Sequence, residues 1–309
     1  MRIYEYRTEF AGLPVAEFSP SADPSKEALA SPASYAWAVR TGYDEDAFGD
    51  VWARFLKTVD TSGITALVIG YWGIYEDKTD VPRLLSDAAA ALPALRALFL
   101  GDIQAEEAEI SWIQHSDTTP VFTAFPALER VEVRGASGLS FEPVRSEALR
   151  LLRFESGGLP SSVVRTVGQS ALPNLEHLDL WLGDGDYGGD ATVDDLAPFL
   201  SGEALPKLRH LGLEDSDIQD AVAAALAGAP VVARLESLSL AMGTLTDTGA
   251  EALLSGQPLG HLKKLDLRHH YLSDMMAERV RTALPGVEID LDGQQELDED
   301  GGLYVEVSE

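Results

Sequence analysis

A short pattern of apolar residues recurs along the chain. It consists of an apolar residue, two variable positions, a second apolar residue, one variable position and a third apolar residue. Alternation of this kind is typical of a β-strand with one buried face. The pattern therefore predicts eight strands and a weaker ninth, with their central residues stacked inside the fold. Those central residues are Leu67, Leu98, Val131, Leu152, Leu178, Leu211, Leu238, Leu265 and Val287.

The segments between these strands have a different periodicity. Apolar residues recur at three and four positions in the ranges 81–92, 220–229, 249–256 and 273–284, which is the spacing of an amphipathic helix. Four of the strands follow a proline, which ends a helix and favours an extended chain. Strand, turn and helix thus alternate. We expect an α/β solenoid of eight to nine irregular repeats, with a curved parallel sheet and outer helices.

The repeat "LESLSLAMGTLTDTGAEAL" resembles the leucine-rich repeats of ribonuclease-inhibitor type, with Leu235, Leu238, Leu240 and Leu245 at that family's offsets. One departure is systematic, because the position that usually holds Asn or Cys carries other residues, such as Gly243. Stretches such as "LPALRALFLGDI" are also similar to a bacterial, mainly actinobacterial, family of repeat proteins of undefined role. These resemblances imply the architecture and no activity.

The two ends of the chain depart from the repeat. Residues 1–60 match no repeat and are expected to form an N-terminal cap, because the end of a solenoid must be covered. Residues 61–291 form the expected leucine-rich repeat domain. Residues 292–309 read as an acidic linker followed by a short strand, "LYVEVSE". This strand is expected to fold back on the chain or to engage a partner, with disorder as the alternative.

Charge and composition narrow the classes of partner. The chain has 51 acidic and 23 basic residues and a net charge of −28. The electrostatic field of such a negative chain repels phosphate backbones and anionic lipids, so we expect no nucleic-acid or membrane partner. A basic protein is the favoured partner. The alternative is that the excess of acidic residues serves only to keep the protein soluble. Cysteine is absent, and neither a signal peptide nor a membrane span is evident, so a cytoplasmic location is expected. The oligomeric state stays open.

Side chains that flank the central apolar residue of each strand should point away from the core. In strands three to six these positions carry charged, histidine and tryptophan side chains. Such residues on a rigid sheet are typical of a recognition surface, with Trp181 as its anchor. The alternative is that opposite charges only neutralise each other. The predicted binding surface comprises Arg130, Glu132, Arg134, Arg153, Glu155, His177, Asp179, Trp181, His210 and Glu214.

Two groups have the chemistry of metal ligands. His177, Asp179 and His210 are side chains that zinc accepts, but they show no recognisable ligand spacing. Asp184, Asp186 and Asp195 match part of a calcium-loop register. The final carboxylate of that register is Asp rather than Glu. A repeat turn followed by a helix with Thr192 as its N-cap accounts for the same residues. The sequence therefore predicts no metal.

Catalytic motifs are lacking as well. The chain has no P-loop, no dinucleotide-binding fingerprint, no nucleophile elbow and no HExxH sequence. We therefore expect no cofactor and no enzyme activity. The favoured function is a non-catalytic protein-binding module that recognises a partner on the concave face of the sheet, and the net charge favours a basic partner. A regulatory subunit of an enzyme is the alternative, and a metal-dependent enzyme is the least favoured.

Overall fold

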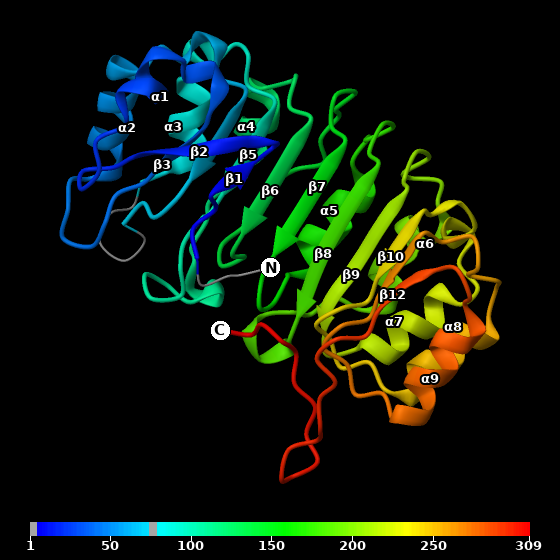
Figure 1. Ribbon diagram of the computed structural model, residues 1–309. Helices are drawn as coiled ribbons and strands as arrows, with labels where there is room; N and C mark the ends of the chain where they lie inside the picture. Colours follow the sequence, from blue (N-terminus) through cyan, green and yellow to red (C-terminus); the bar gives the residue numbers. More distant parts are fainter. Residues whose placement is uncertain (1–4, 74–78) are drawn as a thin grey trace. The chain divides into compact units, whose positions relative to one another are not determined.

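A computed structural model describes residues 5–73 and 79–309. These residues divide between two compact units, residues 1–151 and residues 152–309. Both units are built from strands that alternate with helices, so the expected α/β class with a mostly parallel sheet is confirmed (Figure 1). The boundaries expected after residues 60 and 291 fall inside these units rather than between them.

In the first unit the strands pair in chain order. β1 and β2 are antiparallel, and every later pair from β2 to β6 is parallel. The strands are β1 (Glu9–Phe10), β2 (Leu13–Phe18), β3 (Ala36–Val39), β4 (Ala66–Ile69), β5 (Ala97–Leu100) and β6 (Arg130–Arg134).

The second unit continues the same construction. β8 pairs in parallel with β9, β9 with β10, β10 with β11, and β11 with β12. The strands are β7 (Leu151–Glu155), β8 (His177–Gly183), β9 (His210–Ser216), β10 (Ser237–Ser239), β11 (Lys264–Asp266) and β12 (Glu288–Asp290).

The helices of each unit pack beside one another in chain order, as α3 does against α4, α7 against α8, and α8 against α9. We call the face of the sheet opposite the helices the strand face. The helices are α1 (Lys26–Ala30), α2 (Phe48–Thr58), α3 (Val81–Asp87), α4 (Thr119–Ala124), α5 (Ser161–Gln169), α6 (Ala197–Ser201), α7 (Gln219–Leu226), α8 (Asp247–Ser255) and α9 (Asp274–Ala283).

The predicted core column is confirmed in both units except at its last member. Leu67 pairs with Leu98, and in the second unit Leu211 lies between Leu178 and Leu238 in register; all are buried. In the last pair, however, Leu265 faces Ile289 and not Val287. The expected register is wrong here by two residues, because Val287 still belongs to the turn after α9, where its N–H donates to the carbonyl of Leu284 at 3.2 Å.

Residues before position 60 also contribute to the parallel sheet. β2 and β3 are parallel, and Trp37 of β3 pairs with Leu67 of β4 in the core column. α2 packs against β3 and buries Val51, Trp52 and Phe55. This segment therefore supplies strands and a helix of the kind found later in the chain.

The chain covers the strand face of the first unit with its own N-terminal residues. Phe10 of β1 packs edge-on against Phe99 of β5, with ring centroids 6.1 Å apart, in a buried cluster with Val68. In Figure 1 β1 passes in front of β5. The guanidinium of Arg7 lies over the ring of Phe99 and pairs with Glu132 at 3.3 Å. The apolar residues on the strand face of this unit are therefore internal.

The C-terminal residues fold back on the second unit, as one of the sequence alternatives states. The N–H of Glu306 donates to the carbonyl of Met242 at 2.8 Å, and the N–H of Val307 donates to Asp215 at 3.0 Å. Val305 and Val307 are buried. The sequence predicts a short strand here, but residues 303–309 form no regular strand in the structure. Within residues 5–73 and 79–309, no helix is long and apolar enough to cross a bilayer.

Candidate functional site

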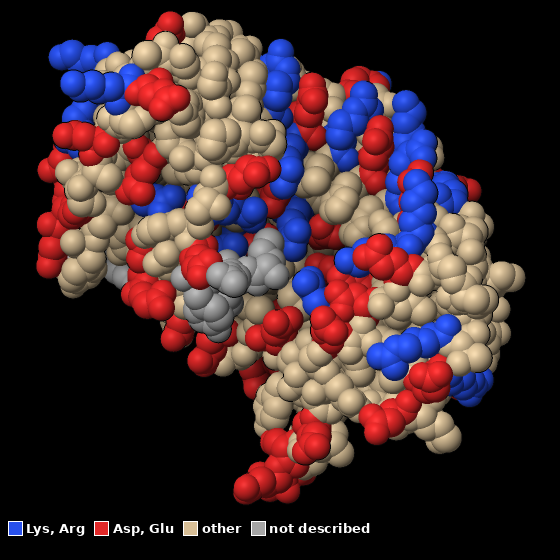
Figure 2. Space-filling view, in the orientation of Figure 1, with Lys and Arg blue, Asp and Glu red and all other residues tan. Residues whose placement is uncertain are grey.

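The strand face of β7 to β11 carries a polar recess in the second unit. Its cavity volume is about 190 Å³. Basic and acidic side chains alternate across the sheet in Figure 2. We call this the strand-face recess and define it by its lining residues, Arg153, His177, Asp179, His210, Glu214, Ser237, Leu238, Ser239, Lys264, Asp266 and Arg268.

Two histidines and one aspartate form the centre of the recess. Nε2 of His177 lies 2.6 Å from Oδ2 of Asp179, and Nε2 of His210 lies 2.7 Å from its Oδ1. The two imidazole rings are stacked, with centroids 3.9 Å apart and planes 11° from parallel. Nδ1 of His210 is in turn 2.7 Å from the hydroxyl of Ser237. One carboxylate thus holds two rings from neighbouring strands.

Register and one glycine explain this arrangement. His177 pairs with His210 across β8 and β9, so the two rings lie side by side on the same face. Asp179 follows two residues later on that face and pairs with Gly212. A Cβ atom at position 212 would collide with Oδ1 of Asp179. Gly212 therefore leaves the space through which the carboxylate reaches His210 on the next strand.

Trp181, the predicted exposed anchor, is buried, with only 1% of its surface accessible. Its Nε1 donates to Oε2 of Glu214 at 2.8 Å, its partner in register on β9. The guanidinium of Arg153 lies over its ring at 5.5 Å. The predicted hot spot is wrong because the large indole packs against its cross-strand neighbours and satisfies its N–H there. The hydroxyl of Ser239 donates to the other oxygen of Glu214.

The pKa values of two buried carboxyl groups of the recess are shifted in opposite directions. Burial by itself would raise the pKa of Asp179, but hydrogen bonds from His177 and His210 outweigh burial and hold that pKa well below its usual range. Burial, followed by the charge of the nearby Asp179, raises the pKa of Glu214. Asp179 is therefore the ionised carboxylate at the centre of the cluster.

Within the ion pairs of the recess, the nitrogen-bearing partner is the more exposed one. Arg153 has a side-chain exposure of 19% and its partner Glu155 has 0%. His177 and His210 have 33% and 20%, against 4% for Asp179. Lys264 and Arg268 have 41% and 32%, against 12% for Asp266. The recess therefore directs its hydrogen-bond donors outward and keeps its carboxylates beneath them.

The remaining predicted surface residues do not form an open surface. In the first unit Glu132 and Arg134 are buried, and Glu132 accepts hydrogen bonds from Arg7 and Arg130. Glu155 is fully buried in the second unit. For these residues the alternative of mutual neutralisation fits better than recognition. The N-terminal segment that covers the first group lies more than a hundred residues away in sequence, so the strand pattern could not reveal it.

The calcium-loop candidate is a turn. Asp184 accepts a hydrogen bond from the N–H of Asp186 at 2.8 Å. Asp195 accepts hydrogen bonds from both the N–H and the hydroxyl of Thr192, and these two residues form the capping box of the following 3₁₀ helix. Asp195 also pairs with Arg165. Among the residues that the structure describes, the group whose ligand atoms converge is His177, Asp179 and His210, not these three aspartates. The capping box of Thr192 and Asp195 agrees with the interpretation of this segment as a turn that leads into a capped helix.

Several polar residues were not among the candidates from sequence. Ser237, Lys264 and Asp266 line the recess from β10 and β11, at strand positions equivalent to those of the predicted residues. Arg40 and Asp102 form a buried ion pair at 3.0 Å in the first unit. The strand pattern could have indicated the recess residues. Nothing local indicates the ion pair, because Arg40 and Asp102 follow different strands.

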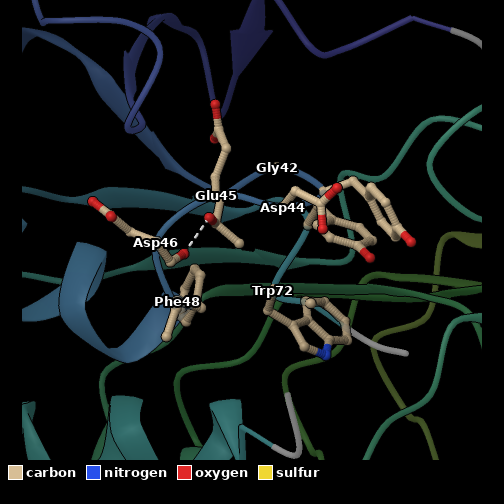
Figure 3. A pocket seen from close by; sticks show the side chains of 11 residues that line it. Gly42, Asp44, Glu45, Asp46, Phe48 and Trp72 are labelled. Carbon is tan, nitrogen blue, oxygen red and sulfur yellow. Dashed lines mark hydrogen bonds between the residues drawn. The ribbon is translucent and has the colours of Figure 1, made fainter. Parts of the chain in front are cut away.

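A smaller hollow lies in the first unit beside the loop that precedes α2, as Figure 3 shows. Gly42, Asp44, Glu45 and Asp46 border it, with Trp72 on the other side. The hydroxyl of Thr41 donates to the carbonyl of Asp46 at 2.5 Å and closes the loop. The cavity volume is about 50 Å³. A space of this size, bordered by a self-closed loop, has no evident ligand.

The fold and the recess define an α/β protein with a mostly parallel sheet and a polar strand face. No family model matches the sequence, and no curated protein matches it. A protein of Bacteroides fragilis, whose crystal structure was solved as a structural-genomics target, is 31% identical. The similarity covers 93% of this chain and 81% of that one, with a TM-score of 0.80. The chain belongs to the same family as this bacterial protein.

Proposed function

We propose that this protein is a leucine-rich repeat protein of the ribonuclease-inhibitor type and acts as a non-catalytic module that binds a partner protein. The repeat assignment is supported by the buried apolar column across parallel strands and by the helices between them. Proteins built from such repeats commonly use the exposed sheet for recognition. In this chain the strand-face recess offers accessible polar groups on the sheet.

One observation carries the choice of partner. Each ion pair of the recess exposes its nitrogen-bearing member and buries its carboxylate. A partner carboxylate can therefore accept hydrogen bonds from Arg153, Lys264 and Arg268 without contacting the buried acids. Charge-assisted hydrogen bonds of this kind are stronger than neutral ones. We infer that the recess binds an acidic segment of its partner.

This inference reverses the expectation of a basic partner, which rests on the net charge of −28. That charge acts at long range and is screened beyond a Debye length of about 8 Å at physiological ionic strength. Contacts inside the recess depend on the nearest groups instead. Long-range repulsion lowers the association rate, whereas the local donors determine the lifetime of the complex.

The test uses three labelled peptides of equal length, rich in glutamate, in lysine or in serine, titrated with the full-length chain and followed by fluorescence anisotropy. We expect the glutamate peptide to bind best. The double variant Lys264→Gln/Arg268→Gln replaces two cationic donors with neutral amides and should weaken binding at least about tenfold, which is about 1.4 kcal/mol.

Lys263→Gln is the matched control, because Lys263 adjoins Lys264 in the chain but pairs with Glu236 outside the recess at 2.6 Å. It should leave glutamate-peptide binding unchanged. Preferential binding of the lysine peptide would instead support a basic partner. Equal weakening by the control and the double variant would place recognition outside the recess.

A further inference from the structure

The centre of the strand-face recess has the composition and convergence of a transition-metal site. His177, Asp179 and His210 each offer one ligand atom, and all three atoms lie within 4.8 Å of one another. The sequence analysis named these three residues as side chains that zinc accepts but predicted no metal, because they lack a recognisable ligand spacing. The register of β8 and β9 brings His177 and His210 together. We propose that these three residues bind a divalent transition metal, with Zn²⁺ as the best-fitting ion. This goes beyond the proposed function, since metal binding needs no partner.

The donor set selects the class of ion. Two imidazole nitrogens and one carboxylate oxygen are typical ligands of zinc and of the neighbouring first-row metals. Calcium and magnesium prefer sites made mainly of oxygen ligands. A three-residue site with an open fourth position is typical of zinc that also contacts water or a further ligand. Here the open position would face the recess.

Metal binding requires the two histidine side chains to move from their present positions. Each Nε2 lies 2.6 or 2.7 Å from an oxygen of Asp179. Zinc bonds of about 2.0–2.2 Å in a tetrahedral arrangement separate neighbouring ligand atoms by about 3.3 Å. The imidazoles must therefore move by about 0.6 Å relative to the carboxylate. The two rings, which stack with planes 11° from parallel, must also tilt toward each other, because a metal lies in the plane of each imidazole that binds it. His177 and His210 are only partly buried, so their rings have room for this movement.

Surrounding groups favour the orientation that a metal requires. Nδ1 of His210 is 2.7 Å from the hydroxyl of Ser237. With the ring proton on Nδ1, this hydroxyl accepts it and leaves Nε2 free to bind a metal. Asp179 is fixed by burial, and Gly212 provides the space that its carboxylate occupies.

Arg153 is the main opposing charge, because its guanidinium lies 3.6 Å from Oδ2 of Asp179. It also pairs with the buried carboxylate of Glu155 at 3.1 Å. Glu214 adds a further buried carboxyl group nearby. The positive charge of Arg153 is thus already balanced by buried carboxyl groups. It lowers the affinity of the site for a metal without preventing binding.

The test begins with the full-length chain, freed of metal by a chelator and titrated with ZnCl₂ in a calorimeter. We expect one Zn²⁺ per chain. His177→Gln and His210→Gln should each weaken binding at least about a hundredfold, because each removes a ligand. Ser237→Ala should weaken it by about tenfold, the low end for loss of a group that orients a ligand.

His261→Gln is the matched control, since His261 is an exposed histidine that bonds to the carbonyl of Val232 at 2.9 Å, away from the recess. It should bind Zn²⁺ as the unmodified chain does. Circular dichroism checks that each variant is folded. Absence of Zn²⁺ binding by the unmodified chain, or equal affinity in the His177 and His210 variants, would overturn the proposal.

Co²⁺ provides a second measurement that needs no variant. Bound at His177, Asp179 and His210, it should show the intense visible absorption of four- or five-coordinate cobalt, and Zn²⁺ should displace it. A weak spectrum like that of six-coordinate aqueous Co²⁺ would contradict the site. Because neither measurement contains a peptide, failure here leaves the proposal of acidic-segment recognition standing.

Discussion

Asp215 shows how one residue is placed by a distant part of the chain. It is buried and lies in the left-handed backbone region, with φ of 52°. Its Oδ1 accepts the N–H of Val307, whereas Oδ2 has no hydrogen-bond partner among the described residues. Burial therefore raises the pKa of Asp215 well above its ordinary value. Ionisation of this side chain works against the folded state.

Asp215→Asn should therefore stabilise the protein above neutral pH. A raised folded-state pKa means that the folded chain binds more protons than the unfolded chain, so this group's contribution to stability falls as pH rises above about 4. Asparagine stays neutral, can still accept the N–H of Val307 and tolerates a positive φ. We expect the free energy of unfolding at pH 8 to increase by at least about 1 kcal/mol, measured by urea denaturation.

The gain from Asp215→Asn should shrink as the pH is lowered toward 4. Asp194→Asn, at an exposed position, is the control and should show no comparable gain. A variant at position 215 that is less stable than the unmodified chain at pH 8 would mean that the ionised carboxylate is stabilised by groups other than those described.

At the scale of the elements, the strands are held by the core column between sheet and helices. Leu211 of β9 is fully buried and lies between Leu178 and Leu238 in register. Leu211→Ala removes buried apolar surface and leaves a cavity, so it should lower the free energy of unfolding by about 2–5 kcal/mol. Urea denaturation followed by circular dichroism measures the change.

Leu297→Ala serves as the control for Leu211→Ala, because the side chain of Leu297 is 58% exposed. Its effect should stay within about 0.5 kcal/mol. A similarly small effect of Leu211→Ala would show that the register of β8, β9 and β10 is wrong.

The helices and strands also show where local patterns stop being sufficient. The ranges 81–92, 220–229, 249–256 and 273–284 predicted α3, α7, α8 and α9, since an amphipathic helix is visible in its own residues. β12 was placed two residues too early because the turn after α9 uses Val287. The end of a helix depends on hydrogen bonds that the apolar pattern does not record.

At the scale of the whole molecule, the net charge of −28 is the dominant property. Self-repulsion of that charge favours the unfolded chain. Exposed ion pairs such as Lys263–Glu236 oppose it but contribute only about 0–1 kcal/mol each, and salt weakens both effects. Buried pairs such as Arg40–Asp102 are screened much less.

Salt should therefore raise the melting temperature. Increasing NaCl from about 0.01 M to about 1 M shortens the Debye length from about 30 Å to about 3 Å, which removes most of the long-range repulsion. We expect a rise of at least about 2 °C by differential scanning calorimetry, equivalent to at least about 1 kcal/mol. Sorbitol at matched osmolality is the control for solvent effects. A fall in melting temperature with salt would mean that attractive surface pairs outweigh repulsion.

The sequence by itself determined the class of fold and most of its core. Periods of two and of about 3.6 residues are local properties, and burial of one face follows from them wherever neighbouring units stack. Leu67, Leu98, Leu178 and Leu211 could therefore be assigned to the core from their own repeats. The capped turn at Thr192 was predictable for the same reason, since Asp195 lies three residues away.

Only the tertiary structure decided which residues of the strand face meet solvent or one another. Trp181 is buried by its partners on neighbouring strands, and Glu132 is reached by Arg7 from the N-terminal segment. His177 and His210 share one carboxylate because the register pairs them and Gly212 leaves room. Periodicity shows which face a side chain takes but not what covers that face. Covering depends on contacts between residues far apart in the chain, and these form only when it folds.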